Sequence, residues 1–166
     1  PTWQKLSDII DLSIIPYGNA EERWDSSKQQ WLFNCQHGAD ECLGNMIETC
    51  AIASVQFDAK KYFPFINCIE ESEELPSEAA KQCATKFQTD YDSIMECVNG
   101  PLGNTLEHQM ALQTNALSPP HQYVPWVTLN GVHTEKIQTE ANENLLKLIC
   151  DTYKGTPPPA CSSEEQ

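Results

Sequence analysis

A cysteine-rich segment constrains this chain more than any other feature of its sequence. Residues 35–50 read Cys-Gln-His-Gly-Ala-Asp-Glu-Cys-Leu-Gly-Asn-Met-Ile-Glu-Thr-Cys. If the segment is helical from residue 41 onward, Cys42 and Asn45 lie on one face, with Cys50 close beside it. Gly38 would allow a sharp turn just before that helix. Three thiols and an imidazole could form a disulfide anchor, a metal site or a redox site, and the spacing leaves all three open.

The cysteine content of the whole chain favours an oxidising compartment. Eight cysteines occur among 166 residues, which is enough for four disulfides. Two pairs are favoured by local spacing. Cys68 and Cys83 flank an acidic loop and would clamp a helical hairpin, whereas Cys150 and Cys161 would tie the proline-rich tail to the last helix. Cys97 is a further disulfide candidate, but the sequence does not indicate its partner.

The charge of the chain excludes some classes of partner. A formal net charge of −14 at pH 7 argues against binding to nucleic acid or to an anionic membrane. No apolar run approaches the roughly 20 residues that a membrane-spanning helix needs. We therefore expect a soluble protein that is secreted or resides in the lumen of an organelle, with neither nucleic acid nor membrane as a partner.

The spacing of the cysteine-rich segment also resembles a known signature. It consists of Cys-Gln-His-Gly, two free positions, Glu-Cys, two free positions, Asn, four free positions and Cys, as in the gamma-interferon-inducible lysosomal thiol reductase family. The matching residues are Cys35, Gln36, His37, Gly38, Glu41, Cys42, Asn45 and Cys50. The resemblance extends to residues 15–20 and 119–131 and covers most of the chain, up to about Cys161.

The resemblance implies a fold class and an organisation. We expect an α/β (α+β) protein with a thioredoxin-like fold and a large helical insertion. Residues 1–40 and 118–155 would form the thioredoxin-like core, residues 41–117 the helical insertion and residues 156–166 an extended tail. The first strand of the sheet and the start of the redox helix are expected upstream of Pro1.

The resemblance also implies an activity. Members of the family look like enzymes that reduce disulfides of unfolding proteins in acidic endosomes and lysosomes, with a small thiol as reductant and no cofactor. Their catalytic element is a Cys-x-x-Cys pair, which does not occur in these 166 residues. The pair is therefore expected upstream of Pro1, no catalytic residue is assigned here, and we predict that this chain alone does not reduce a disulfide substrate.

Two non-enzymatic alternatives are open. The first is a secreted binding protein that keeps the scaffold without the redox pair. The second is a zinc module formed by Cys35, His37, Cys42 and Cys50, but this spacing matches no compact zinc finger, so we predict no metal site. Because no Asn-x-Ser/Thr sequon occurs in the sequence, a glycan tag for lysosomal delivery has no attachment site, and secretion is an alternative to the lysosome.

Substrate binding is predicted at a proline near the C-terminal end of the matched region. Val124, Pro125 and Trp126 resemble the cis-proline loop of thioredoxin-like proteins, which presents backbone groups to a substrate peptide. The alternative is an ordinary trans proline that opens an edge strand. For His37 an acid–base role and metal binding are open, but a histidine that orders its own loop is the preferred interpretation.

The expected elements follow from hydrophobic periodicity and turn residues. We predict a helix end at residues 1–7, a strand at 9–16, a polar loop at 21–30, and a short strand or hairpin arm at 31–33. Residues 41–117 should be helical with interruptions, and these include residues 57–69, where Pro64 should kink or restart the helix. Thr89 or Asp90 should cap a helix at residues 90–98, and Asn99-Gly100-Pro101 should break the helical pattern.

The C-terminal part is expected to contain a strand, a tight turn and a helix. The strand should span residues 126–129. Asn130-Gly131 is a strong two-residue hairpin signal. A helix should follow at residues 141–153, with Leu145 and Leu148 facing inward.

Overall fold

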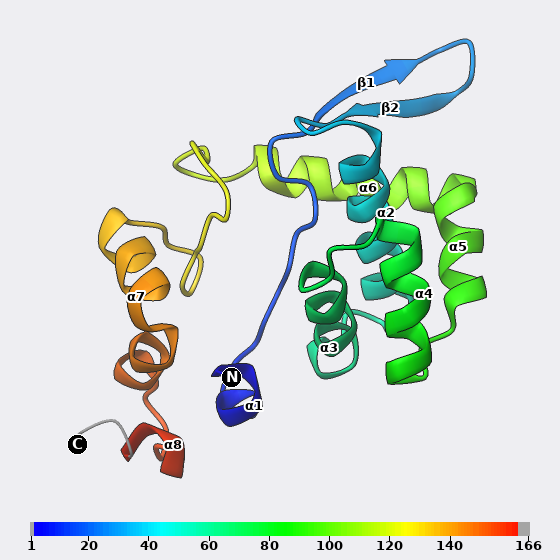
Figure 1. Cartoon of the computed structure of the whole chain (residues 1–166). Coiled ribbons are helices and arrows are strands. Elements are labelled where there is room, and N and C mark those ends of the chain that lie inside the picture. Colours follow the sequence, from blue (N-terminus) through cyan, green and yellow to red (C-terminus); the bar gives the residue numbers. More distant parts are fainter. Residues whose placement is uncertain (1, 163–166) are drawn as a thin grey trace. The chain divides into compact units, whose positions relative to one another are not determined.

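The computed structural model describes residues 2–162 (Figure 1). It is a mixed α+β structure, mostly helical, with a small two-stranded sheet. The chain divides into two compact units: a helical unit (residues 13–120) and a terminal unit (residues 2–12 and 121–162). The thioredoxin-like arrangement and the predicted core, insertion and tail boundaries stay predictions. No helix among the described residues is both long and apolar enough to cross a membrane.

The sheet of the helical unit is a hairpin. Strands β1 (Glu21–Asp25) and β2 (Gln30–Asn34) pair antiparallel, with Trp24 opposite Trp31. The two indole rings lie edge to face, with their centroids 5.3 Å apart, which stabilises the pairing. The predicted arm at residues 31–33 is confirmed. The loop predicted at residues 21–30 is wrong at both ends, since residues 21–25 form β1 and Gln30 begins β2. Polar residues can form these strands because one face of the hairpin is exposed to solvent.

Five helices complete this unit. They are α2 (Ala39–Ser54), α3 (Ala59–Glu70), α4 (Pro76–Phe87), α5 (Tyr91–Asn99) and α6 (Pro101–Asn115), and they confirm the predicted helical block. In Figure 1, α2 lies among the other helices of the unit, and α3 and α4 run side by side. Ile47 of α2, Phe65 of α3 and Ile94 of α5 are buried in the main hydrophobic core. Pro64 lies inside α3, which continues past it, so no new helix begins there.

Local signals fix the boundary between α5 and α6. Asp90 is the N-cap of α5, and its Oδ1 accepts a hydrogen bond from the backbone amide of Ser93 at 3.0 Å. Gly100 alone separates α5 from α6, which begins at Pro101, as the break signal predicted. A Cβ atom at Gly103 would clash with the carbonyl oxygen of Cys97, so only glycine allows α6 to approach α5 this closely.

The two longer predicted strands are not formed. Residues 10–15 are irregular, and within the described part of the chain the only strand pairing of residues 126–129 is an isolated bridge between Leu129 and Val132. A strand needs a neighbour for its backbone groups, and none of the described residues supplies one for either segment. The apolar residues of the first segment pack instead, since Ile14 lies against the main core and Ile15 against a second cluster that contains Tyr17.

The terminal unit contains α1 (Thr2–Leu6), α7 (Glu135–Thr152) and α8 (Pro159–Ser162). Helix α1 confirms the helix end predicted at residues 1–7. Pro1 lies outside the described residues. The predicted turn is also confirmed: Asn130 and Gly131 have φ of 52° and 77°, as a type I′ turn requires. The short helix α8 lies within the predicted extended tail, whose residues 163–166 are outside the described range.

Helix α7 starts earlier than predicted, and an irregular residue midway changes which side chains face inward. It begins at residue 135 because the hydroxyl oxygen of Thr134 caps it by accepting a hydrogen bond from the amide of Ile137. Asn144 has non-helical φ and ψ of −155° and 82°. This irregular residue rotates the following face, so Leu145 is 41% exposed and Leu146 is buried instead. The inward position of Leu145 was therefore wrong, whereas that of Leu148 is confirmed.

All eight cysteines form disulfides. Cys68–Cys83 joins α3 to α4, and Cys150–Cys161 joins α7 to α8, so both predicted pairs are confirmed. The other two bridges are Cys35–Cys42, which closes the start of α2, and Cys50–Cys97, which joins α2 to α5. Cys97 is thus assigned its partner across 47 residues of sequence, a separation at which spacing carries no information.

Candidate functional site: the cis-proline loop and the signature segment

The signature segment forms a closed turn at the start of α2. Gly38, with φ of 98°, precedes the helix, and the Cys35–Cys42 disulfide spans this turn. Glu41 reaches back over it: its Oε2 accepts the backbone amide hydrogen of His37 at 2.6 Å and lies 2.9 Å from Nδ1 of the same residue. The arrangement resembles a capping box, in which a side chain of the first turn satisfies an amide before the helix. His37 is thus bonded within its own loop, and its interpretation as a loop-ordering histidine stays a prediction.

Other signature residues connect the turn to the chain before the hairpin. Asn45 Nδ2 donates to the backbone carbonyl oxygen of Tyr17 at 3.4 Å and lies 4.0 Å from the sulfur of Cys35. Gln36 accepts a hydrogen bond from Asn19 Nδ2 at 3.0 Å. The zinc alternative is not assembled, because three of its four ligands are sulfurs held in disulfides. These signature residues therefore hold the start of α2 in place.

Behind the signature turn, α2 and α6 bury two carboxyl groups that sequence reasoning missed. Glu107 is 2% exposed and accepts a hydrogen bond from the hydroxyl of Thr49 at 2.8 Å. Burial raises its pKa to about 7, against the opposing effect of the Thr49 bond. Burial also raises the pKa of Glu48 well above its usual value, helped by the hydrogen bond and charge of Glu70. Burial therefore favours the neutral form of both carboxyl groups.

The predicted substrate-binding loop has the expected backbone. The Val124–Pro125 peptide bond is cis, which confirms the prediction and rules out the trans alternative; Ser118–Pro119 is also cis. Val124 is 49% exposed. Within residues 2–162, the backbone groups of Val124 and Trp126 form no hydrogen bond. The backbone donors and acceptors of these two residues therefore have no partner within the described part of the chain.

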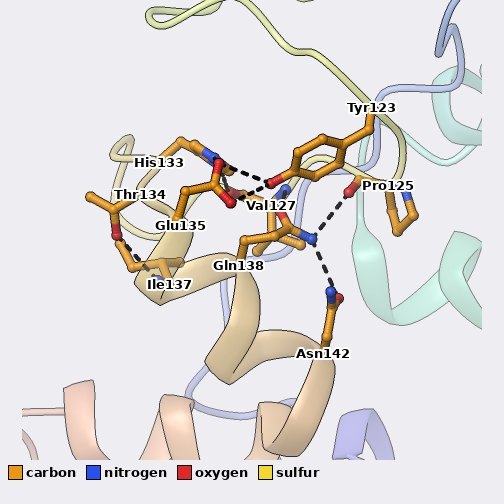
Figure 2. A network of polar contacts seen from close by, with 9 residues as sticks. All are labelled: Tyr123, Pro125, Val127, His133, Thr134, Glu135, Ile137, Gln138 and Asn142. Atoms are coloured by element: carbon orange, nitrogen blue, oxygen red, sulfur yellow. Dashed lines mark hydrogen bonds and ion pairs between the residues drawn. The ribbon is translucent and has the colours of Figure 1, made fainter.

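Two side chains hold this loop from α7 and the turn before it (Figure 2). Gln138, 4% exposed, accepts the amide hydrogen of Val127 at its Oε1 (2.9 Å). Its Nε2 donates to the carbonyl oxygen of Pro125 (3.2 Å). His133 Nδ1 lies 2.8 Å from the carbonyl oxygen of Val127. Because a carbonyl oxygen only accepts, that ring nitrogen carries the hydrogen, and both polar backbone groups of Val127 are engaged.

An aromatic stack covers the same side chains. The His133 ring is parallel to that of Trp126, with 3.4 Å between the centroids, and Tyr123 lies at 4.9 Å from Trp126. The Tyr123 hydroxyl donates to the Glu135 carboxylate at 3.3 Å, and burial together with that charge raises its pKa. His133 Nε2 lies 3.7 Å from Glu135, and both this nitrogen and Trp126 Nε1 are buried without a hydrogen bond among the described residues.

Sequence comparison decides the family. The sequence model of the gamma interferon inducible lysosomal thiol reductase (GILT) family matches residues 1–87, which is more than half of the chain. This chain belongs to the GILT family. Similar relatives include the gamma-interferon-inducible lysosomal thiol reductases of Carassius auratus, 47% identical over 163 residues, and Mus musculus, 40% identical over 166 residues. The gamma-interferon-responsive lysosomal thiol protein of Arabidopsis thaliana is 36% identical over 160 residues.

The alignments cover nearly all of this chain but only part of each GILT relative. They span 97%, 98% and 95% of the chain, and 62%, 63% and 64% of the three relatives. The chain therefore spans about three fifths of their length. Within the chain, the signature cysteines lie in the helical unit and the cis-proline loop lies in the terminal unit.

Sequence reasoning located the proline of the loop but missed its supporting residues. Gln138 lies in the first turn of α7, four residues after the Thr134 cap. A sequence signal was available, since threonine is a preferred N-cap residue and a cap at Thr134 places Gln138 in the first helical turn. The sequence prediction started this helix at residue 141, which left Gln138 outside the helix, so its position beneath the loop was missed.

Proposed function

We propose that this chain is the substrate-binding and structural part of a thiol–disulfide oxidoreductase that reduces disulfides of protein substrates at acidic pH. The single observation that carries the proposal is the cis Val124–Pro125 loop, whose neighbouring backbone groups are open. An extended substrate segment can pair with such groups as an added strand. Membership of a family whose relatives are named thiol reductases supports the same function, and it favours the lysosome over secretion.

The proposed reaction is a thiol–disulfide exchange. A thiolate attacks one sulfur of the substrate disulfide, forms a mixed disulfide and releases the other sulfur as a thiol. A second thiolate then attacks the mixed disulfide, which leaves the substrate as a dithiol and the enzyme as a disulfide. A small thiol reductant returns the enzyme to the dithiol form. No metal or cofactor is needed to balance this sequence.

We propose that the reacting thiols are not among the eight cysteines of this chain, which all form disulfides and include no Cys-x-x-Cys pair. We propose that they belong to a Cys-x-x-Cys pair that precedes Pro1, as the family resemblance implies. An unperturbed thiol is ionised to roughly one part in a few thousand at pH 5, so that pair needs a helix N-terminus that lowers its pKa. The thioredoxin-like fold proposed for the whole protein would supply such a helix.

A second candidate function is a secreted binding protein on the same scaffold, without enzymatic activity. The observation in its favour is again the complete oxidation of the cysteines, since the described chain contains no thiol that could exchange. Such a protein would still bind a peptide on the cis-proline loop but would not need a reductant.

The two candidates are separated by one comparison at about pH 5, with a small thiol as reductant and a protein disulfide as substrate. We expect this chain alone to give no turnover above the reductant-only rate. A longer form that carries Cys-x-x-Cys before Pro1 should turn over, and its double Cys→Ser variant should not. If the longer form binds the substrate but does not reduce it, the binding protein replaces the enzyme as the better proposal.

A further inference from the structure

We propose that Gln138 is a positioning residue of the substrate-binding loop, fixing the backbone on both sides of Trp126 so that a substrate segment meets a preformed edge. The inference rests on the proposed function, because it assumes that the cis-proline loop binds substrate. It assigns a task to a side chain whose hydrogen bonds run to the loop backbone and to Asn142. Figure 2 shows its amide lying beneath the loop, between Pro125 and α7.

The chemistry of the amide matches what the loop needs. Val127 offers an N–H and Pro125 offers a carbonyl oxygen, so one side chain must accept and donate at adjacent atoms. Gln138 does both, at 2.9 Å to the amide nitrogen of Val127 and 3.2 Å to the carbonyl oxygen of Pro125. A carboxylate could only accept and an ammonium could only donate, so the neutral amide suits both bonds.

The Gln138 side chain, called the clamp below because it bonds to the loop on both sides of Trp126, is itself held in a fixed orientation. Gln138 Nε2 also donates to Oδ1 of Asn142, one helical turn later, at 3.3 Å. The Val127 N–H and the Pro125 carbonyl oxygen determine which end of the amide is nitrogen, and the Asn142 bond agrees with that orientation. The Thr134 cap fixes the start of α7, and His133 holds the carbonyl oxygen of Val127 from the other direction. The loop is therefore anchored at three backbone atoms by two buried side chains.

The anchoring has a consequence for binding. With Pro125 and Val127 turned to their partners, the open backbone groups of the loop are those of Val124 and Trp126. A loop that is already ordered loses less conformational entropy when a peptide binds, so part of the affinity should come from the clamp. A purely structural role for Gln138 would lower stability without changing affinity.

The test uses this chain and a synthetic peptide in which two cysteines form one internal disulfide. Gln138→Met keeps the length of the side chain but removes both hydrogen bonds. We expect the Val127 amide to exchange its hydrogen about tenfold faster and the peptide to bind about tenfold more weakly, as the loss of buried hydrogen bonds predicts. Gln122→Met is the matched control, because Gln122 is exposed in the same segment. It should change neither quantity.

A conservative variant gives a readout that a structural role would not. In Gln138→Glu the ionised carboxylate can accept from Val127 but repels the carbonyl oxygen of Pro125. When protonated, the same side chain can again donate and accept. Peptide affinity should therefore be low at about pH 7.5 and return toward that of the parent chain at about pH 4.5, whereas the parent chain and Gln122→Met should lack this difference.

The outcomes separate the inference from the proposed function. If the parent chain binds no peptide while Gln138→Met still accelerates Val127 exchange, the substrate site proposed at this loop is wrong and the clamp serves the fold alone. If the peptide binds the parent chain and Gln138→Met equally well, Gln138 is not a positioning residue, although the proposed function stands. Equal Val127 exchange in Gln138→Met and Gln122→Met would also overturn the inference.

Discussion

Thr49 donates its hydroxyl hydrogen to the Glu107 carboxylate at 2.8 Å, and both residues are buried in the helical unit. Each comes from a different helix, α2 and α6, so the bond lies at the centre of the helix packing. It makes the stability of this unit depend on pH. A carboxyl in such a place is more easily kept neutral than charged.

We predict that the helical unit is more stable in acid than at neutral pH. Burial raises the pKa of Glu107 from its usual 4.5 to about 7. Because the folded pKa exceeds the unfolded one, this contribution is complete below about pH 4.5 and is lost as pH rises through 7. Its size is about 3 kcal/mol, and Glu48 acts in the same direction. Urea unfolding at pH 5 and pH 8 measures it.

The control for this prediction is Glu107→Gln, which accepts the Thr49 hydrogen bond but does not ionise. Its unfolding free energy should vary less between pH 5 and pH 8 than that of the parent chain. An equal pH dependence in both proteins would mean that the pKa of Glu107 is the same in the folded and unfolded chains and that another group controls the effect.

The Cys68–Cys83 disulfide should stabilise the packing of α3 on α4. Replacing both cysteines with alanine should lower the free energy of unfolding by about 2–4 kcal/mol, the usual effect of closing a loop of this length. Denaturant unfolding measures the change. The Cys150/Cys161 double alanine variant is the comparison, and hydrogen exchange at Ile47 should respond to the first variant only, because the second bridge lies in the terminal unit.

Phe65→Ala should be among the most damaging single substitutions in the helical unit. Its side chain is 1% exposed within the main core, so truncation removes buried surface and leaves a cavity, at a cost of about 3–5 kcal/mol. Thermal and urea unfolding report the loss. Phe57→Ala is the matched control, since Phe57 is 60% exposed and its truncation should cost less than about 0.5 kcal/mol.

Asp90→Ala should cost about 1 kcal/mol by removing the N-cap of α5. The effect should be local: the Ser93 amide loses its acceptor and should exchange faster, while amides at the centre of α2 keep their relative protection. Asp90→Asn is the comparison, because asparagine caps helices nearly as well. A loss as large in the asparagine variant would assign the effect to charge.

The sequence predicted local features best. The Asp90 cap, the Asn130–Gly131 turn and the Cys68–Cys83 bridge each depend on residues that are close along the chain or that carry one strong conformational preference. Resemblance to the family added the cis bond before Pro125, which no periodicity could indicate.

Features that depend on distant partners were missed. The segment at residues 9–16 has the composition of a strand, but among the described residues no neighbour pairs with it. The Glu107–Thr49 bond joins residues 58 positions apart, and Cys50–Cys97 joins residues 47 apart. Only the packing of α2 against α5 and α6 brings these pairs together, and propensity does not encode that packing.

The burial of the scaffold disulfides has a chemical consequence. Cys50 is 1% exposed and Cys83 is 2% exposed, so an external thiolate cannot reach either sulfur without opening the helix packing. A protein that works among reducing thiols, as proposed here, faces attack by the same reaction that it promotes. A thiolate can therefore attack these two bonds only at the partner sulfurs of Cys97 and Cys68, which are partly buried, so exchange there should be slower than at the exposed disulfides of an unfolding substrate.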